Sequence, residues 1–544
     1  MVGDPQIIRQ FDSVKSVRYN YETEWQKISE VLDPESRAFT VTNTNGYVSR
    51  RKIYDSTPER SVDDLTSSLM SMLAMPNKQW GVLTLENPEV EQTRDIKKDL
   101  QVATKKVLAH LARPVTNFYN SQADCLFDFA VYGQGYTYMY PDTAKKVVRF
   151  ANIPTQECYA QRDAYGDLTA WYRELVMTPL EVMNTFFDSK YCQYSSEDKR
   201  YIKECIQKDP TKENCLVHAI ISKEEAKAIG VPYQDNRPWV QVFADIDKKR
   251  VLHVDFLKRF PVLAPSWTRK SKSPYGRGPG HKALPEIDTL NAMIKTNLTG
   301  GQLMVQPSMW TPYEMVQSGV LDLSPGANNL YSISDAMTST GIVKPEALHI
   351  VKDLSFPMEM EMFRRQQISQ IFYSDLLQEF KNAEMSATES QVRETARSRK
   401  MSGPLARYEA ENLDRAFVFT FGYLSDWGII KMSSSIKDKD VMVSFRSGLY
   451  ESYTMGKLQL LERATQALAN LKGIPPELSP NFNPEKLLEY VFEHAGADMS
   501  VLEDPAVADE KREQAAQLEQ SQAAASQAQA VNQLSQAFGG ALGA

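Results

Sequence analysis

The chain has 544 residues, of which 42% are hydrophobic and 24% are charged, and its formal net charge is −7. This hydrophobic content is enough to bury substantial cores, so a globally disordered chain is excluded. The negative net charge argues against a protein that binds nucleic acid over its whole surface.

Cysteine and histidine spacing gives no support to a metal site or a disulfide frame. The five cysteines are scattered without a CxxC pair, which is typical of reduced thiols in the cytosol. The six histidines form no HxH or HExxH pattern, so we expect no metal and no cofactor. No apolar run is long enough to cross a bilayer and no signal peptide is apparent, so we expect a soluble protein without a membrane partner.

The sequence predicts helices in the first third of the chain. Apolar residues repeat at three- and four-residue steps from Ile7 to Leu32 and predict an amphipathic helix that ends at Asp33-Pro34. Arg18 interrupts this stripe, although its long stem could lie along an apolar surface. A second helix is predicted after Ser56, which begins a capping box with Glu59. Two further helices are predicted over residues 96–111 and 118–132.

From Cys158 the pattern changes to β structure. Residues 158–162 and 168–177 flank a turn-rich segment and predict a hairpin. Thr178-Pro179-Leu180-Glu181 predicts a capped helix. Further strands are predicted over residues 217–221, 239–244 and 251–256.

Two helices flank a turn-rich segment in the second half. The first is predicted over Ala283–Thr299, ended by Gly300-Gly301. Residues 303–350 are rich in Pro, Gly, Ser and Asn and show little periodicity. The second helix is predicted over Pro357–Phe380, where Ile368 and Phe372 belong to an apolar stripe that recurs every four residues.

A short polar break follows, and a third helix is predicted after it. The break runs from Lys381 to Ala387, and Ser386 with Glu389 forms a capping box that restarts the helix. We predict a kink at Gly403 and Pro404, because a proline ring removes one helical hydrogen bond. Helices are also predicted near residues 452–471 and 483–496, and the Ala- and Gln-rich tail from residue 513 fits a helical barrel or a disordered end.

Short glycine motifs invite a phosphate-binding interpretation, but the sequence argues against it. Gly133-Gln134-Gly135 and Gly276-Arg277-Gly278 lack the Lys-Ser/Thr of a P-loop, and Pro279 would disturb a dinucleotide fingerprint. Glycines that supply tight turns explain both motifs better. There is also no GxSxG and no Cys–His signature, so we expect no enzyme.

Two separated motifs carry a family resemblance. The first runs Asp55-Ser56-Thr57-Pro58-Glu59-Arg60 and continues to Met75-Pro76 and Trp80. The second includes Tyr275, Gly276, Arg277, Gly278, Pro279, Gly280, Ala283, Leu284, Pro285, Leu290 and Asn291. In this order the chain resembles the head-to-tail connector (portal) proteins of short-tailed (podovirus, T7-like) bacteriophages.

The resemblance implies an α+β portal fold, mainly helical, whose parts we assign by position. A wing with helices followed by a β-rich part would cover residues 1–282, and residues 388–450 would complete it with the long kinked helix. Two stem helices would cover 283–302 and 353–380, with a clip at 303–352 between them. A tunnel loop would occupy 381–387, a helical crown 451–512, and the C-terminal tail 513–544.

The resemblance also implies a function and a set of partners. A portal protein forms a dodecameric ring at one capsid vertex, and double-stranded DNA enters and leaves through it. Implied partners are further copies of the chain, the terminase large subunit, a tail adaptor, capsid and scaffold proteins, and internal core or ejection proteins. The protein would belong to the virion and pass through the host cytoplasm during assembly. The alternatives are another ring-shaped head-tail adaptor or an enzyme of the packaging machinery.

Two groups of residues are candidates for contact with DNA. The tunnel loop comprises Lys381, Asn382, Ala383, Glu384, Met385 and Ser386. It would face the channel, although a plain surface turn is the alternative. Arg393, Arg397, Lys400 and Arg407 share one helical face. This basic stripe is either a solvated or subunit-interface surface or a positive surface near the DNA.

Overall fold

The structure is a computed structural model that describes residues 4–34, 39, 52–76, 79–85, 94–270, 273–305, 309–310, 337–338, 341–342, 346–347, 355–374, 400–431 and 441–445. The chain divides into two compact units, residues 1–90 with 100–449 and residues 91–99 with 450–544. Of the second unit, the structure describes residues 94–99 alone. The predicted crown and C-terminal tail lie outside the described residues.

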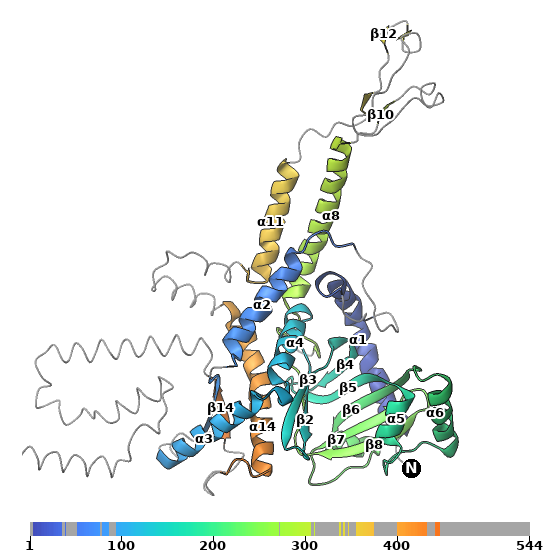
Figure 1. Cartoon of the computed structure of the whole chain (residues 1–544), viewed down its shortest axis with the longest axis vertical. Coiled ribbons are helices and arrows are strands. Elements are labelled where there is room, and N and C mark those ends of the chain that lie inside the picture. Colours follow the sequence, from blue (N-terminus) through green and yellow to red (C-terminus); the bar gives the residue numbers. More distant parts are fainter. Residues whose placement is uncertain are drawn as a thin grey trace, which may run out of the picture. The chain divides into compact units, whose positions relative to one another are not determined.

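A five-stranded antiparallel sheet forms the β-rich part of the first unit, with strand order β4-β5-β6-β7-β8 (Figure 1). Its strands are β4 (Cys158–Arg162), β5 (Leu168–Met177), β6 (Asn214–Ser222), β7 (Trp239–Asp245) and β8 (Arg250–Leu257). Alternate residues of β6 belong to different cores, with Val217 and Ala219 in one and Leu216 in another. The sheet therefore buries side chains on both faces, as period-two alternation requires.

Helix α1 (Asp4–Leu32) packs on one face of this sheet through Ile7, Ile8 and Phe11. Further along the helix, Arg18 is 1% exposed and donates to the backbone oxygens of Gln156 and Cys158. Its guanidinium also pairs with Glu22. We expected the Arg18 stem to lie along an apolar surface; the whole side chain is buried, and its charge is met by carbonyls and a carboxylate.

The other face of the sheet is covered by α5 (Pro179–Phe186) and α6 (Ser196–Lys208). The capped helix predicted after Thr178 is confirmed, because the Thr178 hydroxyl accepts from Glu181 N and the Glu181 carboxylate accepts from Thr178 N. Helix α7 (Lys223–Ile229) follows β6.

Helices and small sheets make up the rest of the first unit. The helices are α2 (Thr57–Leu73), α4 (Phe118–Val131) and the part of α3 (Arg94–Leu111) that begins at Leu100. A three-stranded sheet has the order β3-β2-β9, with β2 at Thr137–Asp142, β3 at Val147–Asn152 and β9 at Val262–Leu263. An antiparallel pair joins β1 (Gly81–Leu85) to β14 (Val441–Phe445), which the sequence did not predict. This mixture of helices and antiparallel sheets confirms the α+β class.

One cap prediction was wrong. Ser56 makes no side-chain hydrogen bond at the start of α2. Instead Oδ1 of Asp55 accepts from the backbone N of Thr57 at 2.7 Å. The carboxylate one residue earlier caps the helix, because an acceptor two residues before a free N–H can form the same local turn.

Two long helices, α8 (Pro279–Val305) and α11 (Ser355–Ile371), lie side by side (Figure 1). The predicted end at Gly300-Gly301 was wrong, since α8 continues to Val305. The predicted helix through Phe380 was wrong too, because α11 ends at Ile371 and Tyr373 adopts a left-handed φ of 60°. Tyr373 stacks on Trp267, so a tertiary contact overrides the apolar periodicity there.

Between these helices the structure describes four short strands. They are β10 (Met309–Trp310), β11 (Met337–Thr338), β12 (Gly341–Ile342) and β13 (Glu346–Ala347). Strand β10 pairs with β13 and β11 pairs with β12, both antiparallel. The clip assignment otherwise falls outside the described residues and stays a prediction.

The last described helical segment begins at Lys400, and its α-helical pattern runs through Gly403 and Pro404 to Tyr408. Residues Glu409–Leu413 then form a π-helical turn before α14 (Asp414–Asp426). The structure thus places a departure from α geometry five residues after Pro404. The kink at Gly403-Pro404 stays a prediction, and the tunnel loop of residues 381–387 lies outside the described residues.

Candidate functional site

The glycines of the second motif allow two stretches of backbone to touch. A Cβ on Gly276 would lie 2.3 Å from the Gly133 oxygen, and one on Gly278 would lie 2.8 Å from the Gly133 Cα. A Cβ on Gly280 would lie 2.2 Å from the Val131 oxygen. The two glycine motifs therefore pack against each other at the start of α8, where any side chain would separate them.

Aromatic rings fix the same segment to α1. Tyr275 is 1% exposed, and its ring meets those of Tyr21 and Trp25 edge-on, at centroid distances of 5.1 Å each. The Ser273 hydroxyl donates to the backbone oxygen of Tyr275, and the backbone N of Arg277 donates to the backbone oxygen of Thr268. These contacts set the direction in which the chain enters α8.

The two sequence motifs meet in space at a polar junction. The backbone N of Tyr54 donates to Oδ1 of Asn291 on α8 at 3.2 Å. The next residue, Asp55, accepts from Nε of Arg365 on α11 at 2.7 Å. We call Asp55, Asn291, Arg365 and Glu361 the stem junction, since together they join the start of α2 to both long helices.

The electrostatics of the junction favour the ionised carboxylate. Burial by itself would raise the pKa of Asp55, but hydrogen bonds from Thr57 and Arg365 outweigh it and hold that pKa below its usual value. The Arg365 guanidinium also pairs with Glu361 one turn earlier, at 3.3 Å. The junction is therefore an ionic clamp in which one guanidinium meets two carboxylates.

Polar bridges continue along the two long helices. Arg364 on α11 pairs with Glu286 on α8, with 2.5 Å between Nη1 and Oε2. Asn297 donates to Oε1 of Glu361, also at 2.5 Å. The buried Ile287, Ile294 and Ile368 add an apolar seam. These polar bridges fix the position of α11 along α8 and hold the two helices together as a pair.

The outer surface of this pair is unusually apolar. Large hydrophobic side chains remain exposed along both helices, and we call them the stem band: Leu298, Met304, Val305, Phe356, Met358, Met362 and Phe363. The most exposed of them, Val305 and Phe356, are each 70% exposed. An exposed apolar surface of this kind indicates a place where another surface binds.

The π-helical turn positions residues that the sequence analysis missed. Glu411 accepts hydrogen bonds from the backbone N and the hydroxyl of Ser266, each at 2.9 Å, and pairs with Arg269. Its neighbour Asn412 is fully buried and donates to the Cys125 sulfur at 3.5 Å. An extra residue in a helical turn has no periodic signature, so no sequence pattern could have placed this turn.

Of the residues predicted to contact DNA, the structure describes Lys400 and Arg407. The tunnel loop residues, with Arg393 and Arg397, lie outside the described residues. Lys400 and Arg407 are both exposed. In the described part of the chain, no group of three or more His, Cys, Asp or Glu side chains could hold a metal ion. Among the same residues, no helix is long and apolar enough to cross a membrane.

Comparison with known proteins gives consistent matches over most of the chain. A family model described as "Bacteriophage head to tail connecting protein" matches residues 4–502. A "Probable portal protein" of Bordetella phage BPP-1 is 23% identical, over 91% of this chain and 88% of its own length. The "Portal protein" of Salmonella phage epsilon15 is 20% identical, over 97% of this chain and 93% of its own length.

Among solved structures, a chain of the "Virion of native gene transfer agent (GTA) particle" matches with a TM-score of 0.39 and 12% identity. The match covers 76% of this chain and 86% of that one. The short-tailed, T7-like subtype stays a prediction.

Proposed function

Because the chain belongs to the family of bacteriophage head to tail connecting proteins, we propose that its copies form a closed dodecameric ring at one capsid vertex. Double-stranded DNA passes through this ring when the capsid is filled and again when the genome leaves. The two relatives named as phage portal proteins, matched over most of their length, support this assignment.

The stem band carries the proposal. Its side chains project from helices that already pack against each other, so folding of the single chain leaves them in water. Phe356 and Met362 come from α11, whereas Leu298 and Val305 come from α8. An exposed apolar surface that two helices share suits a head-to-tail contact in which each copy covers part of the next. Such a contact closes into a ring when the rotation between copies allows it.

The ring acts by geometry and charge rather than by bond chemistry. A channel lined with many Lys and Arg would neutralise phosphates and hold DNA by counterion release. The net charge of −7 fits a conduit through which DNA slides, with few and well-placed basic contacts. The tunnel loop, with Lys381 beside Glu384, would supply a compliant contact of this kind around the DNA.

The remaining partners follow from the same assignment. The clip, residues 303–352, would bind the terminase large subunit during packaging and then the tail adaptor. Capsid and scaffold proteins would contact the ring within the head, as would internal core or ejection proteins. The protein would assemble in the host cytoplasm and remain in the virion. An enzyme of the packaging machinery is the rival from another class, and sustained ATP turnover by the purified protein would favour it.

Charge placed in the stem band tests the proposal. We expect Phe356→Glu with Met362→Glu to leave folded subunits that do not form rings, because each carboxylate would be buried without a partner. Lys145→Glu, in the exposed turn after β2, is a control that changes charge away from the band. Light scattering after size exclusion gives the mass of each variant. Normal rings from the doubly substituted protein would refute the stem contact.

A further inference from the structure

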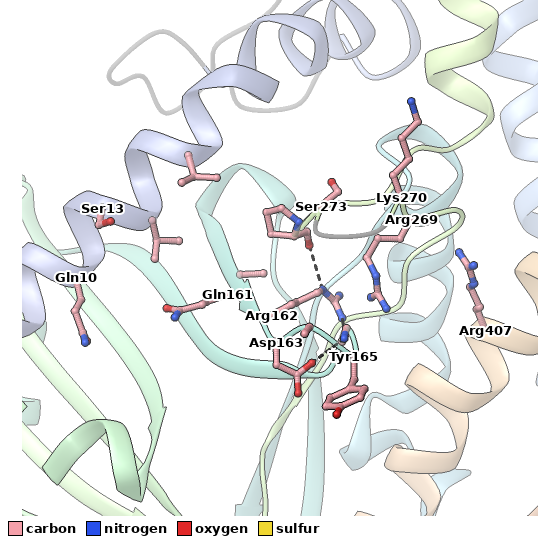
Figure 2. A pocket seen from close by; sticks show the side chains of 16 residues that line it. Gln10, Ser13, Gln161, Arg162, Asp163, Tyr165, Arg269, Lys270, Ser273 and Arg407 are labelled. Carbon is pink, nitrogen blue, oxygen red and sulfur yellow. Dashed lines mark hydrogen bonds between the residues drawn. The ribbon is translucent and has the colours of Figure 1, made fainter. Parts of the chain in front are cut away.

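A basic depression lies beside α1, away from the stem junction. It has a volume of about 700 Å³ and is bordered by α1, by the turn between β4 and β5, and by the loop that precedes α8. Its lining includes four cationic side chains, Arg162, Arg269, Lys270 and Arg407, and one carboxylate, Asp163. Figure 2 shows that these cations come from three separate parts of the chain.

Internal contacts neutralise this charge incompletely. Arg162 donates to the backbone oxygens of Gly166, Ala264 and Pro274, so its hydrogen bonds go to uncharged acceptors. Arg269 pairs with Glu411 at 3.5 Å. Lys270 and Arg407 are exposed, and neither forms an ion pair with another described residue. The depression thus keeps an excess of positive charge that faces solvent.

The composition of the rim favours a protein partner over a nucleic acid. Tyr165 at the tip of the β4–β5 turn is 93% exposed, and Val17 on α1 is 46% exposed. Tyrosine and arginine around a small apolar surface are typical of protein–protein contacts.

The chain also carries an acidic surface of suitable chemistry. Glu59, Asp63 and Asp64 are exposed on α2, and their side chains form no ion pair or hydrogen bond with another described residue. Glu59 and Asp63 are one turn apart and so lie on the same face of the helix. Arg60 is the single positive charge in α2, so the helix keeps a net negative charge.

We propose that the basic depression of one subunit binds the acidic face of α2 on the neighbouring copy. This inference rests on the proposed ring, in which every copy offers both surfaces and each contact joins two different ones. The ionic contact would determine which surface of the neighbouring copy is bound and in which register. The stem band would add the apolar contact area between the copies. Each ring would then repeat the same ionic contact between all its subunits.

Charge reversal tests the inference. We expect Lys270→Glu with Arg407→Glu to lower the fraction of protein in rings about tenfold or more at 0.1 M NaCl, because like charges would then face each other. Adding Glu59→Lys and Asp63→Lys to this protein should restore rings. Lys145→Glu with Lys203→Glu, at exposed positions on other elements, changes the net charge equally and should leave rings intact.

Each result separates this inference from the proposed function. Normal rings from the reversed variant would overturn the inference and leave the ring standing. If the variant with four substitutions forms no more rings than the variant with two, the assignment of the partner surface to α2 is overturned. If reversal spares the rings but abolishes binding of a short DNA duplex, measured by fluorescence anisotropy, the depression serves nucleic acid instead. Absence of rings in the unaltered protein would overturn both proposals.

Discussion

A single methyl group at Gly280 tests the packing that starts α8. The alanine Cβ would lie 2.2 Å from the Val131 oxygen and 3.1 Å from its carbonyl carbon, whereas ordinary contact begins at 3.4 Å. The two backbones would have to separate by more than 1 Å. Both belong to packed elements, since Gly280 and Val131 are buried and no flexible side chain can yield.

The expected cost can be estimated from comparable substitutions. Overpacking of a tight core costs about 1–3 kcal/mol, and the gain in helix propensity from Gly to Ala offsets at most about 1 kcal/mol. Gly301 on the same helix is a matched control, because its Cβ would meet nothing within 4 Å. Gly301→Ala should therefore leave stability unchanged or raise it by about 0.5–1 kcal/mol.

Thermal unfolding of the two variants, followed by circular dichroism, measures the difference. At about 2–4 °C per kcal/mol for a large domain, Gly280→Ala should unfold several degrees below Gly301→Ala. Both variants replace glycine by alanine in the same helix. The gain in helix propensity therefore cancels when their unfolding midpoints are compared. Equal midpoints, or a higher midpoint for Gly280→Ala, would refute the close backbone contact.

Three further predictions concern the junction, the buried histidines and the tunnel loop. Asp55→Asn should lower the unfolding midpoint relative to the exposed control Asp188→Asn, and only above about pH 4, because the lowered pKa of Asp55 adds stability once the carboxylate is ionised in both states; equal midpoints at pH 7 would contradict the clamp. Burial lowers the pKa of His218 and of His281 to about 3, so the unfolded chain binds protons first and the midpoint should fall as the pH drops from 6.5 towards 4. His218→Gln should flatten that slope, and an unchanged slope would argue against a neutral, buried ring. Deletion of residues 382–385 should leave rings intact but give particles that lose or underfill their DNA, measured as genome length per particle; full retention would rule out the channel role.

Local patterns predicted most of the regular elements. Apolar periodicity placed α1 and α2, and the turn-rich segment between residues 158–162 and 168–177 placed the hairpin of β4 and β5. The helices could be placed because each buries one face, which leaves a period in the sequence, whereas the large sheet buries side chains on both faces. Helix ends were harder, as Tyr373 shows: its left-handed turn depends on Trp267, which lies far away in the chain.

Long-range contacts account for what the sequence could not give. The motif resemblance marked both Asp55 and Asn291, but nothing local showed that the backbone of Tyr54 meets Asn291 across 237 positions. The pairing of β1 with β14 is a similar case, because each strand alone is a short apolar run. The basic stripe was defined on one helix, whereas Arg407 lies with Arg162 and Arg269 from other elements.

The proposed function depends on assembly of this chain into a closed ring with a channel. Class averages from electron microscopy of the purified full-length protein test it directly, because they report symmetry and opening together. We predict a dodecameric ring with a central channel for the unaltered protein. We predict no rings for the variant with Phe356→Glu and Met362→Glu. Particles that remain single subunits or open chains at every protein concentration tried would contradict the account.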